Sequence, residues 1–153
     1  MNIYIFLLCY NEESLLPHLI KHYKKYLPSA NIIIYDNEST DNSLNIANLN
    51  GCEIISWNSN NQIDDLKYVD IKNNCWKHIK DGWIIVSDMD EFLCVSELDL
   101  ENEGKKNTSI LTVKGIDIIG DSKNIELDDI NLQELKRYQD NNFESKNLCF
   151  YKN

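Results

Sequence analysis

Short apolar runs alternate with helical patterns over the first 93 residues of the chain. The runs span 3–9, 31–35, 52–57 and 83–87 and are nearly continuous in Ile, Leu, Val, Tyr and Phe. Such continuous strands are typical of parallel sheets that are covered by helices on both faces. Strands that alternate with helices indicate βαβ units. We therefore expect an α/β, Rossmann-like fold with a mostly parallel sheet.

Two helices are predicted between the first three runs. The first is capped by Ser14, has Pro17 in its first turn and ends at Pro28. The second begins after residue 39 or 40, with Asp41 in its first turn, and stops before Gly51.

A third helix is predicted over about 64–81, with Gly82 just past its end. The helical period then selects an inward face formed by Leu66, Val69, Trp76 and Ile79.

The pattern changes after residue 95. Residues 96–107 form a polar, acidic connection, and 110–115 are typical of a strand. A short helix is expected at 131–139 and a last strand at 148–151. The chain of 153 residues has the usual size of one domain with one core, so we expect a single domain.

Charge and cysteine content exclude several classes of protein. The formal net charge is −10, whereas a nucleic-acid interface needs clustered Lys and Arg. No apolar stretch approaches the roughly 20 residues of a membrane span. The five cysteines form no C-x-x-C pair and are typical of buried thiols in a reducing cytoplasm.

Polar segments follow each of the four apolar runs, at 11–13, 36–39, 58–62 and 88–91. Asn, Asp and Ser are also favoured in ordinary turns. If the four strands are parallel, however, all four segments emerge at the same edge of the sheet, which is where open α/β folds bind ligands.

The sequence contains no glycine-rich phosphate cradle. Carboxylates can still hold a diphosphate when Mg²⁺ or Mn²⁺ lies between them. Asp88 and Asp90 suit this role, because residues two apart in an extended segment project to the same side while Met89 turns the other way. An isolated Asp-x-Asp is weak evidence, and a solvated acidic turn is the alternative.

Three segments, taken in order, resemble one known family. These are 8–12 (Leu-Cys-Tyr-Asn-Glu), 35–41 (Tyr-Asp-Asn-Glu-Ser-Thr-Asp) and 83–93, which contains Asp-Met-Asp-Glu-Phe. Together they resemble the opening strand, the "D-N-x-S-x-D" element and the "D-x-D-E-F" strand of nucleotide-sugar glycosyltransferases with the GT-A fold, in particular the family 2-like group. The resemblance covers about residues 3–95. It implies a nucleotide-binding half at 1–95 and an abbreviated acceptor-side half at 96–153.

The resemblance also implies a site. Asp36 would hold the base or ribose, Asp88 would touch the ribose or a metal-bound water, and Asp90 would bind Mn²⁺ or Mg²⁺ directly. Asp88 and Asp90 are together the metal candidates. The candidate nucleotide-binding residues are Cys9, Tyr10, Asn11, Glu12, Asp36, Gln62, Lys72, Asp88 and Met89.

The implied reaction is transfer of a sugar from a nucleoside diphosphate, with a uridine diphosphate sugar as the commonest donor in the family. The acceptor hydroxyl, on a glycan, lipid or protein, is unspecified. An inverting transfer would need a carboxylate base, for which Asp117 and Asp121 lie in the right region, although spacing selects neither. The three histidines fall on predicted helices, and none is assigned as a ligand.

Three alternatives stay open. A degenerate or fragmentary sugar-nucleotide-binding module without transfer activity fits the short C-terminal part. A nucleotidyltransferase usually carries a Gly-rich, basic loop after the first strand, which 11–13 does not resemble. A phosphoacceptor receiver-type domain would have its paired acids after the first strand, whereas the clearest pair here follows the fourth.

Overall fold

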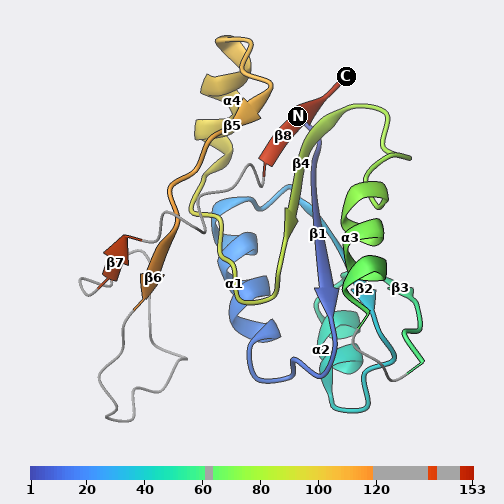
Figure 1. The fold of residues 1–153 in the computed structure, drawn as a ribbon. Helices are drawn as coiled ribbons and strands as arrows, with labels where there is room; N and C mark the ends of the chain where they lie inside the picture. The colour runs from blue at the N-terminus through green and yellow to red at the C-terminus, as the bar shows by residue number, and fades with distance from the viewer. Residues whose placement is uncertain (61–63, 119–137, 141–148) are drawn as a thin grey trace.

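A computed structural model of the chain describes residues 1–60, 64–118, 138–140 and 149–153. In this described part, six strands form the main sheet in the order β3-β2-β1-β4-β8-β5 (Figure 1). They are β1 (Ile3–Cys9), β2 (Asn31–Asp36), β3 (Glu53–Ser56), β4 (Gly82–Ser87), β5 (Ile110–Leu111) and β8 (Cys149–Lys152). A small second sheet pairs β6 (Ile116–Ile118) with β7 (Tyr138–Asp140). The helices are α1 (Leu16–Tyr26), α2 (Ser43–Leu49), α3 (Asp65–Asn74) and α4 (Glu97–Lys105).

The first four strands run parallel. β1 lies between β2 and β4, and β3 pairs with β2. β8 runs antiparallel to β4 and pairs on its other side with the short β5. The sheet is therefore mostly parallel, which confirms the predicted α/β, Rossmann-like fold class.

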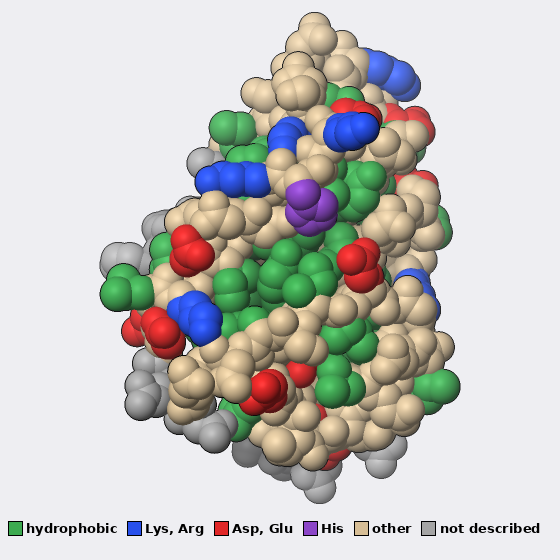
Figure 2. All heavy atoms as spheres, turned by 90° about the vertical axis from the view of Figure 1, so that its right-hand side faces the viewer, with side chains coloured by type: hydrophobic (Ala, Val, Ile, Leu, Met, Phe, Trp, Pro, Cys, Tyr) green, Lys and Arg blue, Asp and Glu red, His purple; other side chains and the backbone are tan. Residues whose placement is uncertain are grey.

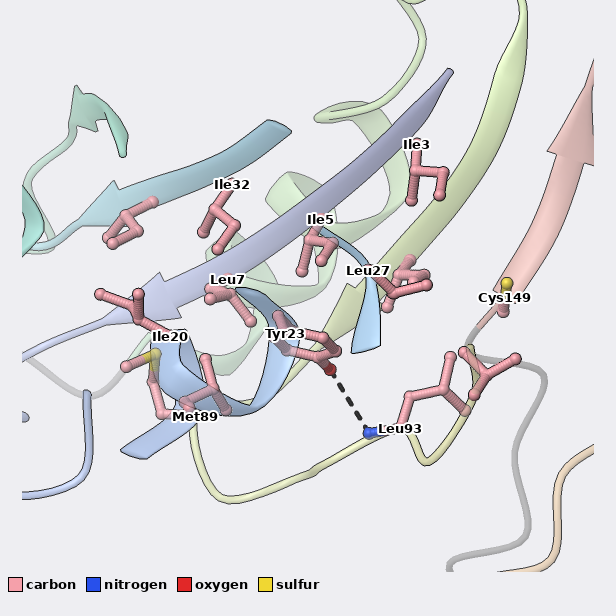
Figure 3. Packing of buried hydrophobic residues seen from close by; sticks show 14 of the residues in the cluster. Ile3, Ile5, Leu7, Ile20, Tyr23, Leu27, Ile32, Met89, Leu93 and Cys149 are labelled. Carbon is pink, nitrogen blue, oxygen red and sulfur yellow. Dashed lines mark hydrogen bonds between the residues drawn. The ribbon is translucent and has the colours of Figure 1, made fainter. Parts of the chain in front are cut away.

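Helices cover both faces of this sheet, with α1 and α3 on opposite sides of β1 (Figure 1). Ile5 and Leu7 of β1 point toward Tyr23 of α1 and form one core with it (Figure 3). Phe6 points to the opposite face, where it forms a second cluster with Cys75 just after α3. The alternation of side chains along one strand thus supplies both cores.

The strand predictions hold to within one residue for the first four runs and for the last strand, now found at β8. These strands could be predicted because their apolar runs are continuous, which is typical of strands covered by helices on both faces. The strand expected over 110–115 is shorter, since β5 contains only Ile110 and Leu111.

The starts of the first two helices differ from the prediction. Leu15, not Ser14, precedes α1, and no side chain caps that end, although Pro17 lies in the first turn as expected. α2 begins at Ser43, so Asp41 precedes the helix instead of lying in its first turn. There the Asp41 carboxylate accepts a hydrogen bond from the backbone N–H of Ser43 (3.0 Å).

The third helix is shorter than predicted and turned about its axis. α3 ends well before residue 81, and Gly82 lies in β4 instead of capping the helix. Leu66 and Val69, expected to face inward, are 84% and 54% exposed. Tyr68 and Ile71 face the sheet side instead, where Ile71 packs against the second core cluster. Trp76 and Ile79, the other two residues predicted to face inward, follow the end of α3 and do pack against this cluster.

The prediction of a loop over 96–107 is wrong, because this segment contains α4. Ser96 and Asp99 form a capping box, in which the Asp99 N–H donates to Ser96 Oγ (3.3 Å) and the Ser96 N–H donates to Asp99 Oδ2 (2.8 Å). Leu100 anchors the helix in the core. The helix expected over 131–139 is wrong at its end, because 138–140 form β7; residues 131–137 lie outside the described part.

His22 on α1 is buried, as expected for a packing histidine. Burial lowers its pKa, so the unfolded chain takes up a proton on this side chain more readily than the folded chain. Between about pH 6.5, the ordinary value, and the lowered folded value, the free energy of unfolding should therefore decrease as the pH falls.

We expect the substitution His22→Gln, which keeps an N–H donor, to reduce this loss of stability below pH 6.5. Urea denaturation of both proteins at a series of pH values measures it. Identical pH dependence in the two proteins would contradict the assignment to His22.

Candidate nucleotide and metal site

The carboxyl ends of β1, β2, β3 and β4 meet at one edge of the sheet, as the parallel order requires. The ladder continues beyond the strands, because the N–H of Asn37 donates to the carbonyl of Cys9 (2.9 Å) and that of Trp57 to the carbonyl of Asp36 (2.9 Å). The polar segments predicted to converge therefore start side by side.

Asn11 joins the loop after β1 to the loop after β2. Its Oδ1 accepts hydrogen bonds from the backbone N–H groups of Thr40 (2.7 Å) and Asp41 (3.3 Å), and its own N–H donates to Ser39 Oγ (2.9 Å). Its φ of 56° lies in the left-handed region, which Asn tolerates better than most residues. The side chain predicted to bind nucleotide thus holds the loop after β2 in place.

Glu12 follows Asn11 and interacts electrostatically with Asp90 in the acidic turn after β4. Its backbone N–H donates to Ser43 Oγ (2.8 Å), and its side chain is half-buried. Burial raises the pKa of Glu12, and the negative charges of Asp90 and Asp41 raise it further. A cation bound between Glu12 and Asp90 would relieve this repulsion.

Cys9 and Tyr10 lie at the start of the same loop. Burial raises the pKa of the Cys9 thiol to about 11, so the group is an unreactive thiol whose Sγ lies 3.9 Å from Ser39 Oγ. Tyr10 is 46% exposed, which leaves much of its ring open to solvent or a ligand.

Asp36, at the end of β2, has one satisfied and one unsatisfied oxygen. Oδ2 accepts a hydrogen bond from the backbone N–H of Ser39 (3.0 Å). Oδ1 is buried and has no hydrogen-bond partner, while the residue as a whole is 1% exposed. A buried acceptor without a partner costs about 1–3 kcal/mol, so such groups call for an explanation, of which a bound ligand is one.

The acidic segment after β4 forms a tight turn. The N–H of Glu91 donates to the carbonyl of Asp88 (3.1 Å), and the Asp88 N–H donates back to Glu91 Oε2 (3.3 Å). Met89 is buried in the core and Asp90 is exposed. The segment is a turn and not the extended stretch that was predicted, although Met89 does point into the core and away from the exposed Asp90. A nucleotide contact at Met89 would involve its backbone.

Lys72 on α3 forms an ion pair with the first acid of the turn. Its Nζ lies 2.5 Å from Asp88 Oδ1, and both side chains are about one-third exposed (33% and 36%). This pair fixes α3 against the turn and brings a positive charge to the site. Asp88 thereby has a cationic partner already, which leaves Asp90 as the better direct ligand for a metal.

Tyr68 lies at the candidate site, although its position could not be predicted from the motifs. It lies one helical turn before Lys72 and packs edge-on against Trp57 after β3 (ring centroids 5.0 Å apart). Burial raises its pKa, a hydrogen bond with the Asn37 side chain opposes this, and the charges of Asp88 and Glu12 act on it. The Tyr68 hydroxyl therefore faces the site from the α3 side.

The remaining predicted residues lie elsewhere or outside the described part. Gln62 and Asp121 fall in segments 61–63 and 119–137, which the structure does not describe. Asp117 lies in β6, which belongs to the small second sheet and not to the main sheet. Among the described residues, no group of three or more His, Cys, Asp or Glu side chains is arranged to hold a metal ion. A cation here would need phosphate or water as further ligands.

A cleft of about 700 Å³ lies at the opposite end of the sheet. Asn2 before β1, Asp81 before β4 and Tyr151 of β8 line it together with part of α4. It is separate from the carboxyl edge and contains none of the candidate residues.

Comparison with solved structures confirms the fold. TarS from S. aureus superimposes with a TM-score of 0.53 and 15% identity over 73% of this chain and 21% of its own. A mannosyltransferase from Pyrobaculum calidifontis, in complex with GDP-Man and Mn²⁺, superimposes with a TM-score of 0.53 and 12% identity over 74% of this chain and 35% of its own. The chain thus has the GT-A glycosyltransferase fold predicted from its motifs.

Comparison with curated sequences gives a shorter match. Protein RfbJ of Shigella flexneri is 34% identical over 55 residues, which are 36% of this chain and 43% of RfbJ. No family model matches the chain. The chain therefore spans less than half of the relative and of the solved structures that it resembles. None of the helices in the described residues is both long and apolar enough to cross a membrane.

Proposed function

We propose that the chain binds a nucleoside diphosphate sugar together with Mn²⁺ or Mg²⁺ and belongs to a glycosyltransferase. The observation that carries this proposal is the unsatisfied, buried Oδ1 of Asp36 at the same sheet edge as the Asp88–Glu91 turn. On a GT-A fold, this arrangement supports a nucleoside at Asp36 and a diphosphate near the acids.

The residues present fit a hard cation. Asp90 is exposed, and the negative charge of Asp90 acts on the partly desolvated Glu12. Mg²⁺ and Mn²⁺ take one or two protein carboxylates and complete their shell with phosphate oxygens and water. We infer that Asp90 would hold the metal, with Glu12 beside it, and that Asp88 would contact the ribose or a metal-bound water. When bound, such a cation neutralises charge on the departing diphosphate.

The protein groups around the diphosphate would act by charge and position. Lys72, within reach of Asp88, brings a cation toward the same space. Asn11 and Glu13 hold the β2 loop in place by accepting hydrogen bonds from its backbone N–H groups. Preorganised groups of this kind cost little reorganisation when charge develops in the reaction.

The nature of the transfer remains part of the proposal. A uridine diphosphate donor, an inverting mechanism and a cytoplasmic location follow the resemblance, and the acceptor is unassigned. Asp117 is the described candidate for the base. The alternative is a sugar-nucleotide-binding module without transfer activity.

Thermal-shift measurements on the whole chain test the binding proposal. A panel of nucleoside diphosphates, each with and without Mn²⁺, should contain at least one that raises Tm only when Mn²⁺ is present. At about 100 times the Kd, a ligand of the native state should raise Tm by roughly 5–10 °C for a chain of this size. If no nucleotide gives an Mn²⁺-dependent shift, the proposal is wrong.

The same panel on Asp36→Asn tests the role of the unsatisfied oxygen. The amide can accept from Ser39 N–H or accept from a ligand N–H, but it has one oxygen where Asp36 has two. We expect about 10-fold or greater loss of nucleotide affinity, with little change in Tm of the free protein. Asp99→Asn, in the capping box of α4, is the control that should keep full affinity.

A further inference from the structure

Helix α1 binds the segment that follows the acidic turn at residues 88–91. Leu93, two residues after Glu91, is buried, and both of its backbone polar groups are bound by side chains of α1. Its N–H donates to the hydroxyl of Tyr23 (3.4 Å), which Figure 3 shows as a dashed line, and its carbonyl accepts from Nε2–H of His22 (3.0 Å). The segment leaving the turn is therefore fixed at both hydrogen-bonding groups of one residue.

The contact continues from Tyr23 into the turn itself. The Tyr23 hydroxyl lies beside the side chain of Ser87, the last residue of β4, which acts to lower the pKa of Tyr23 against the effect of burial. The Ser87 Oγ in turn lies within hydrogen-bond distance of the carbonyls of Glu91 (2.7 Å) and Asp88 (3.1 Å). The contacts of Tyr23 and Ser87 therefore link the Leu93 N–H to the backbone of the turn that contains Asp90.

Packing reinforces these bonds. Tyr23 is 0% and Ser87 1% exposed, so water does not compete for their hydroxyls. The His22 ring packs edge-on against that of Phe92, with centroids 5.4 Å apart. Both α1 side chains are buried, so neither is open to a ligand in solvent.

We propose that Tyr23 and His22 are positioning residues that fix the acidic turn and thereby set the affinity of the site for a divalent cation. The inference rests on the proposed function, in which Asp90 holds the metal. Metal affinity depends on how well the groups behind a ligand hold it in place, and loss of such a group typically lowers affinity by about 10- to 100-fold.

The test is the Mn²⁺ dissociation constant of the full chain, measured by calorimetric titration. Tyr23→Phe keeps the ring in the core but removes the hydroxyl that joins Leu93 to Ser87. We expect its Mn²⁺ affinity to fall by about 10-fold, with Tm lowered as well. The control Ile5→Val removes one methyl group from the β1 core, and it should lower Tm without changing Mn²⁺ affinity.

Substitutions at His22 add a test by conservative replacement. His22→Ala removes the donor to the Leu93 carbonyl and should weaken Mn²⁺ binding, whereas His22→Gln retains an N–H donor and should restore most of it. Ser87→Ala breaks the last bond to Glu91 and serves in place of Tyr23→Phe if that variant does not fold.

The outcomes separate the two proposals. If the native chain binds no Mn²⁺, with or without a nucleoside diphosphate, both the metal site and the positioning role are overturned. If the native chain binds Mn²⁺ and Tyr23→Phe, or Ser87→Ala in its place, binds it equally well, only the positioning role is overturned.

Discussion

Asp90→Ala is expected to abolish the Mn²⁺-dependent part of nucleotide binding while leaving the fold intact. Asp90 is exposed at the turn and its negative charge raises the pKa of the half-buried Glu12. Removing it takes away the best-placed cation ligand and leaves Glu12 alone. Loss of a residue that only holds a metal ligand in place typically lowers metal affinity by about 10- to 100-fold. Loss of the ligand itself should therefore lower it by at least about 100-fold.

Without ligand, Asp90→Ala should not destabilise the protein. Without the neighbouring charge, the pKa of Glu12 should return toward its ordinary value, and the free energy of unfolding should stay unchanged or rise slightly. Thermal shifts with a nucleoside diphosphate, with and without Mn²⁺, measure both effects in one experiment. Retention of the full Mn²⁺-dependent shift in Asp90→Ala would place the metal elsewhere.

Asp88→Asn is the matched comparison, two residues away on the same turn. Asp88 already pairs with Lys72, so Asp88→Asn removes a carboxylate and also releases the Lys72 ammonium group from its ion pair. We expect a smaller loss of Mn²⁺ affinity than in Asp90→Ala. Equal losses would instead indicate that both acids bind the metal directly.

The position of the candidate site at one edge of the sheet could be predicted from the sequence, because it follows from the parallel order of the strands alone. Once the apolar runs were assigned to parallel strands, the loops that contain Asp36 and Asp88 had to emerge together. No rule of spacing, however, says which oxygen of Asp36 lacks a partner. That depends on the path of the loop that places the N–H of Ser39 beside Oδ2.

The α3 side of the site could not be predicted in the same way. Leu66 and Val69 repeat at helical spacing and suggested the buried face, yet both are exposed. The face that meets the site contains Tyr68 and Lys72, whose four-residue spacing competes with the apolar pattern. A polar site accepts a polar helix face, so hydrophobic periodicity gives the wrong rotation where function replaces core packing.

The missed helix α4 has a related cause. Its sequence is acidic and only Leu100 is fully buried, so it lacks the apolar stripe that identifies most surface helices. The Ser96 and Asp99 pair was the available signal, since a capping box begins a helix whatever the composition that follows.

Gly82→Ala is expected to destabilise the fold more than the same change at Gly51 or Gly104. Gly82 begins β4 with a φ of 137°, a conformation that L side chains rarely adopt. A Cβ here would lie 2.8 Å from the backbone oxygen of Asn2 and 3.1 Å from the ring of Tyr4. Asn2 cannot move freely, because the same oxygen accepts the N–H of Trp83 (3.0 Å).

Backbone strain together with this contact should lower the free energy of unfolding by at least about 2 kcal/mol. Gly104→Ala is the matched control, because Gly104 lies within α4 and a Cβ there meets no atom within 4 Å. That change should be neutral or stabilise by up to about 1 kcal/mol. Urea denaturation of the two variants compares them directly, and equal stabilities would contradict the strain at Gly82.

Gly82 and the acidic turn occupy opposite ends of the same strand, so this pair of variants also separates folding from binding. At temperatures where Gly82→Ala is still folded, its nucleotide and Mn²⁺ affinities should match those of the native chain, because residues 83–87 keep their pairing with β1. A loss of affinity in the folded variant would show that strain at the start of β4 reaches the turn at its end. In that case the position of Asp90 would depend on the register of the whole strand as well as on the contacts around the turn.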